Sequence, residues 1–144
     1  MSCGCGSKNC NVCCGNSGST QSFLKFAASL AGGTGTYYLA DGGVATPATA
    51  AENSYPTPEP FYARSFSVKL DTLVPTGSIT FNLLRSGVVV GSIVFDSSVT
   101  DLTQRLALPN NGVRYGRNNT YAVQAVIAGE PPSVVANVTL ALRS

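Results

Sequence analysis

The stretch that decides the fold runs from Gly77 to Phe95 and reads GSITFNLLRSGVVVGSIVF. In its first half apolar and polar side chains alternate, and the apolar members of this alternation are Ile79, Phe81 and Leu83. Such a period of two is typical of a β-strand with one buried face. Arg85-Ser86-Gly87 then supplies a turn, and a second apolar run follows it. We therefore predict a β-hairpin, with Gly91 as a candidate bulge in the returning strand.

The same alternation recurs on both sides of this hairpin. Further strands are predicted at residues 22–30, 37–39, 62–70, 121–127 and 134–142. Within the segment 62–70, the residues expected to share one face are Tyr62, Arg64, Phe66, Val68 and Leu70.

The segments between the predicted strands are rich in turn-forming residues. The strongest cluster is Pro109-Asn110-Asn111-Gly112. Residues 100–108 are the only candidate for a helix, and residues 41–60, with four prolines, are expected to pack extended along the surface. About eight short antiparallel strands predict an all-β sandwich, and eight strands in two sheets is the number found in a jelly roll.

The composition excludes several classes of function. The chain has 144 residues, which suits one domain, and its net charge of +2 is too balanced for a dedicated nucleic-acid binder. It contains no histidine, the commonest general base and metal ligand. It also lacks a glycine-rich phosphate loop and a nucleophile beside a base. The sequence therefore predicts neither an enzyme nor a bound cofactor.

No targeting or membrane segment is predicted either. Residues 1–9 lack the basic and apolar regions of a secretory signal peptide, and no apolar run approaches the roughly 18 residues that a membrane span requires. We expect a soluble protein that does not follow the signal-dependent export route and has no membrane partner.

The cysteines are confined to the start of the chain. All five lie in the first 14 residues, at Cys3, Cys5, Cys10, Cys13 and Cys14. Residues 1–21 otherwise hold mainly Gly, Ser, Asn, Thr and Gln, which cannot bury enough apolar area to fold alone. We predict a flexible Cys-rich arm at residues 1–21, followed by a β-sandwich domain at residues 22–144.

Three interpretations of the cysteines stay open. The arm could carry free thiols, or Cys10 and Cys13 could hold zinc or copper together with further thiolates. The third is crosslinking between chains, which we favour because an odd number of thiols cannot all pair within one chain. Adjacent Cys13 and Cys14 have Cα atoms only about 3.8 Å apart, below the usual disulfide range, so they would seek different partners. Those partners must be arm cysteines of the same or a neighbouring chain.

The predicted strands carry few charges on the faces opposite the apolar positions. Natural strand edges normally carry charges that prevent pairing with another chain, and here such guards are sparse. A low-charge soluble domain that does not assemble would show the same pattern of sparse charges. The functional interpretation is that edges pair between subunits and extend the sheets into an assembly.

A short arm with a Cys-Cys pair before one small β-domain resembles the endospore appendage (Ena) fibre subunit family of Bacillus-type bacteria. The residues that carry the resemblance are Val12-Cys13-Cys14, the spacer from Gly15 to Gln21, and the β-domain from Ser22 to Ser144. The resemblance implies that the arm reaches into a neighbouring subunit and is locked there by disulfides of Cys13 and Cys14, while β-augmentation builds the fibre wall. Members of the family usually have a partner cysteine in or near the β-domain, and this chain has none after Cys14. The arms would then pair with one another.

The resemblance also implies a place and partners for the protein. Such subunits are made in the mother cell, assemble around the spore and are released by lysis, which would explain the missing signal peptide. The expected partners are other copies of the chain, with a spore-coat or exosporium protein as an anchor.

Two alternatives come from other functional classes. One is a lectin-like or exosporium-tip binding module built as a closed trimeric jelly roll, in which six tyrosines could line a sugar-binding face: Tyr37, Tyr38, Tyr55, Tyr62, Tyr115 and Tyr121. The other is a thiolate metal-binding protein.

Overall fold

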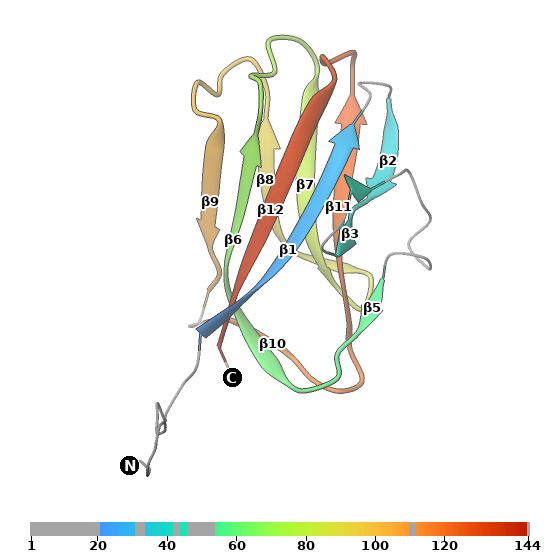
Figure 1. The fold of residues 1–144 in the computed structure, drawn as a ribbon, viewed down its shortest axis with the longest axis vertical. Coiled ribbons are helices and arrows are strands. Elements are labelled where there is room, and N and C mark those ends of the chain that lie inside the picture. Colours follow the sequence, from blue (N-terminus) through green and yellow to red (C-terminus); the bar gives the residue numbers. More distant parts are fainter. Residues whose placement is uncertain (1–20, 31–33, 42–43, 46–53, 110–111, 144) are drawn as a thin grey trace.

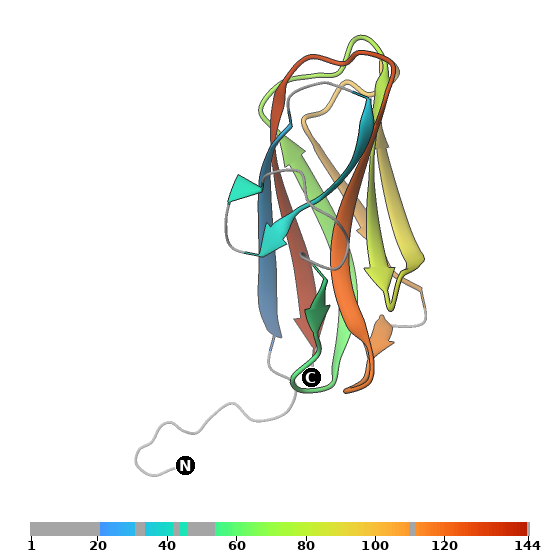
Figure 2. The same cartoon turned by 90° about the vertical axis from the view of Figure 1, so that its right-hand side faces the viewer.

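The chain folds as a sandwich of two β-sheets that face each other along their whole length (Figures 1 and 2). The computed structural model describes residues 21–30, 34–41, 44–45, 54–109 and 112–143. These residues form twelve strands and no helix. The all-β prediction and the sandwich are therefore confirmed.

The first sheet holds seven strands. Its hydrogen-bonded order is β10 (Val113–Tyr115), β6 (Phe61–Leu70), β12 (Val134–Arg143), β1 (Gln21–Leu30) and β3 (Ala40–Asp41), and β9 (Thr103–Ala107) and β4 (Val44–Ala45) join it at its borders. β9 and β10 both pair with β6, while β3 and β4 both pair with β1, so the seven strands occupy five positions across the sheet. All pairs are antiparallel except the short contact of β4 with β1.

The second sheet holds five strands. Its order is β2 (Gly35–Tyr38), β11 (Thr120–Ala128), β7 (Ser78–Arg85) and β8 (Val88–Phe95), and β5 (Tyr55–Pro56) also pairs with β11. All of these pairs are antiparallel. Eight of the twelve strands are four residues or longer, which agrees with the expected number of main strands.

The hairpin formed by β7 and β8 is the one predicted from the sequence. Ser86 and Gly87 both have positive φ, 49° and 82°, as the two central residues of a type I′ turn require. Leu83 pairs with Gly91 and Leu84 with Val89, so one extra residue is inserted in β8 and forms a bulge. The turn is confirmed, and β8 does contain a bulge, but its extra residue is Val90, next to the predicted Gly91.

The core lies between the two sheets and is entirely apolar at its centre. Its largest fully buried side chains include Phe26, Phe66, Phe81, Phe95 and Leu140, each at most 1% exposed. Burying a side chain of this size contributes about 1.5–3 kcal/mol. The alternation predicted for residues 121–127 and 134–142 is confirmed, because the expected apolar positions of β11 and β12 are buried.

The only helix candidate is a strand in the structure, and one prediction about the faces of a strand is wrong. Residues 103–107 of the helix candidate 100–108 form β9, which pairs with β6 and thereby extends the first sheet. In β6, Arg64 does not share a face with Phe66: Ala63 and Phe66 are buried and Arg64 is exposed. The cause is a bulge, because Ser65 pairs with Ala141 and Ala63 with Leu142, which leaves Arg64 as the extra residue.

The segment 41–60 is described only in part. Residues 42–43 and 46–53 lie outside the described residues, so the prediction of an extended surface segment is tested only at its ends. There, Asp41, residues 44–45 and residues 55–56 belong to the short border strands β3, β4 and β5.

Candidate assembly surface

The five cysteines, Cys3, Cys5, Cys10, Cys13 and Cys14, lie outside the described residues. The structure describes the residue at which the domain begins: Gln21 opens β1 and pairs with Arg143, near the end of β12. The first described residue, Gln21, therefore lies at the same end of the sandwich as Arg143. The apolar hollow of about 310 Å³ at this end is lined by Leu24, Phe61 and Tyr121, among others.

One border of the second sheet is an open edge. β8 pairs with β7 on one side and is the last strand in the order of that sheet, so about half of its backbone amides point away from any described strand. Three of its valines are exposed: Val88 at 64%, Val89 at 49% and Val94 at 45%. Residues 88–95 carry no charge and no proline, and the bulge is the one irregularity that guards this edge.

The other borders are better protected. β9 and β10, which both border β6, each carry an exposed arginine, Arg105 and Arg114. β5 contains Pro56, β2 has four residues, and β3 and β4 have two each. Charges, proline and short length are the usual devices that stop an edge from pairing with another chain. β8 is therefore the most favourable edge in the described structure for adding a strand.

The two sides of the sandwich also differ. In Figure 1, β8 and β9 lie on one side and β2, β3 and β5 on the other. A Cβ added at Gly91 of β8 would lie 3.0 Å from a methyl carbon of Leu108 and 3.1 Å from one of Leu106. The two sheets therefore pack closely together on the side that holds β8 and β9. Pairing of unlike sides is a heterologous contact, which repeats without closing into a ring unless the rotation happens to close.

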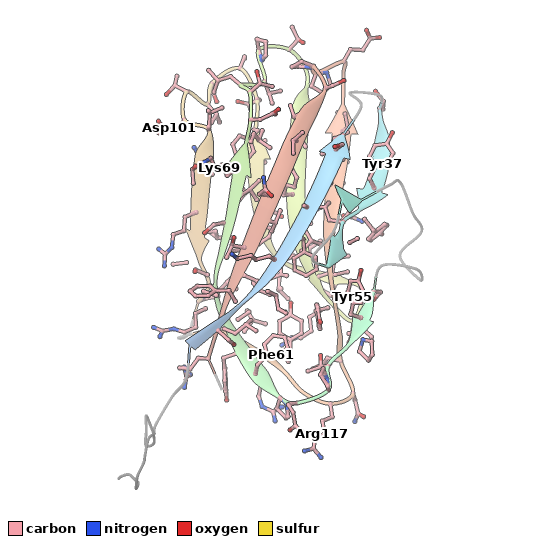
Figure 3. All side chains as sticks on the ribbon, viewed as in Figure 1. Tyr37, Tyr55, Phe61, Lys69, Asp101 and Arg117 are labelled. Carbon is pink, nitrogen blue, oxygen red and sulfur yellow. The ribbon has the colours of Figure 1, made fainter. Side chains whose placement is uncertain are left out.

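The two ends of the sandwich carry opposite charges. The loops at residues 71–77, 96–102 and 129–133 hold four carboxylates and no lysine or arginine, and the carboxylates are Asp71, Asp96, Asp101 and Glu130. The opposite end holds Arg85, Arg114, Arg117 and Arg143, and its one described ion pair joins Arg117 to Glu59 at 3.3 Å. Figure 3 labels Asp101 and Arg117 at these opposite ends. The long axis of the domain is therefore electrically polar.

Hydrogen bonds within the acidic end hold two of its carboxylates. Asp96 accepts hydrogen bonds from the backbone amide of Ser98 at 2.9 Å and from its hydroxyl at 2.5 Å, and these bonds lower the pKa of Asp96. Asp71 accepts one from the amide of Val135 at 2.8 Å. Asp101 and Glu130 are exposed and keep their carboxylates at the surface.

The tyrosines that we considered for a sugar-binding face do not form one. Tyr115 and Tyr121 are buried in the core, and Tyr115 stacks on Phe61 with ring centroids 4.9 Å apart. The hydroxyl of Tyr115 donates to the carbonyl of Leu84 at 3.1 Å. Burial raises the pKa of Tyr115 above its ordinary value, although Arg85 nearby acts in the opposite direction. Those two rings are structural, because they join the sheets at the basic end.

Among the described residues, no three side chains of metal-binding type lie together, and none of the described segments is a helix able to cross a membrane. The cysteine arm is not among these residues, so the zinc or copper interpretation stays a prediction. No family model matches this chain, and no curated protein matches its sequence.

Proposed function

We propose that this chain is a structural subunit that self-assembles into an extracellular fibre of the endospore appendage kind. Subunits would be joined by strand pairing between their edges and stapled by disulfides of the arm cysteines, Cys13 and Cys14 above all, with Cys3, Cys5 and Cys10 as further partners. The fibre would lie on the spore surface, anchored by a coat or exosporium protein. No catalytic site, cofactor or metal is part of this proposal.

The observation that carries the proposal is the open edge of β8. An uncharged edge strand with three exposed valines is a template for another strand, and soluble proteins that stay monomeric usually guard such an edge. Pairing there satisfies backbone hydrogen bonds and buries the valines in one step. The difference between the two sides of the sandwich supports a repeating contact over a closed dimer.

Two further observations support the proposal. The strand orders β9-β6-β12-β1 and β8-β7-β11-β2 distribute the eight main strands as two interleaved Greek keys do, which supports jelly-roll topology. The opposite charges of the two ends favour stacking of copies head to tail along the long axis. The charge difference gives the subunit a fixed direction along its long axis.

The experiment compares two valines of similar exposure in the full chain under oxidising conditions. Val89→Lys puts a charge on the open edge, whereas Val135→Lys puts the same charge on β12, a strand paired on both sides. We expect the wild-type chain and Val135→Lys to form long fibres in electron micrographs, and Val89→Lys to remain in small species. Fibres of wild-type length from Val89→Lys would remove the role of this edge.

The disulfides are tested separately. Fibres of the wild-type chain should fall apart only when a reductant is combined with denaturant, while fibres of the Cys13→Ser, Cys14→Ser double variant should yield to denaturant alone. A monomer on non-reducing gels of the wild-type chain would contradict the proposed function. Retention of zinc or copper through purification would favour the metal-binding alternative.

A further inference from the structure

The outer face of the seven-stranded sheet contains a hollow, whereas the open edge β8 belongs to the other sheet. Its volume is about 500 Å³, within the range of roughly 300–1,000 Å³ found for small-ligand sites. Its lining includes the hydroxyl side chains Ser65, Ser67 and Thr139, and the larger side chains Phe23, Arg64 and Arg105. These residues come from four strands that are separated in the sequence.

The register of the sheet explains the shape of the hollow. One row across it reads Arg105, Ser67, Thr139 and Lys25, from β9 through β6 and β12 to β1. The next row reads Ala107, Ser65, Ala141 and Phe23 in the same order. Small side chains on the two middle strands form the floor, and larger ones on the flanking strands form the walls. With strands about 4.8 Å apart, β9 and β1 are about 14 Å apart, which leaves room for one sugar ring.

The bulge of β6 completes one wall. Because Arg64 is the extra residue of the bulge, it leaves the inward face and lines the hollow beside Arg105. Neither arginine takes part in an ion pair with any residue that the structure describes, and no acidic residue lines the hollow. Lys25 and Lys69 lie in neighbouring positions of the same face. The hollow is therefore cationic and has no internal counter-charge.

The opposite wall is aromatic. Phe23 is 57% exposed, so its ring is accessible from the hollow that it lines. We propose that this hollow binds a sugar that carries a carboxylate, a uronic acid residue within an acidic glycan. The ring of Phe23 would pack on the apolar C–H face of the sugar. The guanidinium of Arg105 or Arg64 would hold the carboxylate by paired hydrogen bonds, and Ser67 and Thr139 would meet the sugar hydroxyls.

The combination of groups favours this ligand class over other anions. A free phosphate would use the arginines but gain nothing from Phe23, and an acidic peptide would lack a flat apolar face to set against the ring. The site lies within one subunit, so it does not depend on the proposed fibre. If the subunits do polymerise, repeated sites along the fibre would raise a weak single affinity by multivalency.

The test titrates the full chain under reducing conditions with three probes, and binding is followed by calorimetry. The first is a hexasaccharide of alternating glucuronate and N-acetylglucosamine, the second is the same sugar with its carboxylates reduced to alcohols, and the third is a glutamate peptide of equal charge. We expect saturable binding of the first probe with a Kd of about 0.1–1 mM, and at least about tenfold weaker binding of the other two.

Variants of exposed residues locate the site. Arg105→Gln and Phe23→Ser should each weaken binding of the acidic hexasaccharide at least about fivefold, since each removes one wall. The matched controls are Arg117→Gln, an exposed arginine at the basic end, and Val135→Ser, an exposed apolar residue of the same sheet, and both should bind as the wild-type chain does. Unchanged melting temperatures show that all four variants are folded.

Three outcomes would overturn the proposal. They are no binding of the acidic hexasaccharide, equal binding of its reduced form, and equal binding of the glutamate peptide together with an unaffected Phe23→Ser variant. The last would indicate a general polyanion surface. None of these results bears on whether oxidised chains form fibres, so the two proposals fail independently.

Discussion

The outer faces of the two sheets cover the same apolar core, but their side chains differ in chemistry. On the five-stranded sheet, one row crosses four strands as a chain of side-chain hydrogen bonds. Ser92 donates to Asn82 at 2.6 Å, Asn82 to Gln124 at 2.8 Å, and Gln124 to Tyr38 at 2.8 Å. The matching row on the seven-stranded sheet reads Arg105, Ser67, Thr139 and Lys25, with a cation at each end.

The two faces differ in whether their polar and charged side chains have partners within the same face. The polar groups of the first row are partners of one another, so a ligand would have to break existing bonds to reach them. The cations of the second row have no described ion-pair partner and repel one another weakly. A face of the second kind gains from an anionic ligand, and a face of the first kind does not.

The largest effects are expected in the core, where the two sheets should behave alike even though their outer faces differ. Phe66 lies under the cationic face and Phe81 under the neutral face, and each is 0% exposed. Replacing either by alanine should cost about 3–5 kcal/mol of unfolding free energy through lost transfer energy and a cavity. Urea unfolding of the reduced full chain measures both. A cost below about 1 kcal/mol at one position only would mean that the sheet above it is loosely packed.

A variant of intermediate effect tests what the hydrogen-bonded row of the five-stranded sheet contributes to stability. Asn82 stands at the centre of the hydrogen-bonded row, so Asn82→Ala removes bonds to both Ser92 and Gln124. The row is partly exposed and water can replace part of the loss, so we expect a cost of about 1–2 kcal/mol.

The matched control is Asn137→Ala, an exposed asparagine in the middle of β12 on the cationic face. Its effect should stay within about 0.5 kcal/mol, as for most exposed substitutions. Thermal unfolding of the two variants side by side makes the measurement. Equal losses at Asn82 and Asn137 would show that the hydrogen-bonded row adds nothing to stability.

Most of the fold could be predicted from the sequence because core packing imposes a period of two. The alternations around Phe81, Val123 and Val138 state directly which side chains are buried, and the I′ turn follows from Ser86-Gly87. The bulge at Arg64 could not be predicted, since an inserted residue shifts the alternation without changing the residue types around it. β9 lies within residues 100–108, the only helix candidate in the sequence, and its pairing with β6 depends on a register that the sequence does not show.

Some surface features could also be predicted from the sequence, and others could not. The absence of charge in residues 88–95 is visible in the sequence, whereas their place at the edge of a sheet comes from the strand order of the structure. The hollow is not visible, because Phe23, Arg64 and Arg105 meet only through a register between distant strands. The cysteine arm stands out in the sequence because all five cysteines lie within the first 14 residues, and its role is a proposal.

The smallest effect concerns the charges of the cationic face. Lys25→Glu places a carboxylate in the row that ends at Arg105, three strand spacings or about 14 Å away. The Debye length is about 10 Å at 0.1 M salt and about 30 Å at 0.01 M, so this attraction is felt mainly at low ionic strength. We expect a gain of about 0.2–0.5 kcal/mol in unfolding free energy at low salt, and none at high salt.

The control for this prediction is Thr36→Glu, an exposed position of β2 on the neutral face. With no cationic row nearby, its unfolding free energy should change little with salt. Urea unfolding at several salt concentrations compares the two variants, and the quantity of interest is the slope of their difference against ionic strength. A slope for Lys25→Glu no larger than that for Thr36→Glu would mean that the cations already have anionic partners. The argument for an anionic ligand at this face would then lose its basis, whereas the hydrogen-bonded row of the other face would be unaffected.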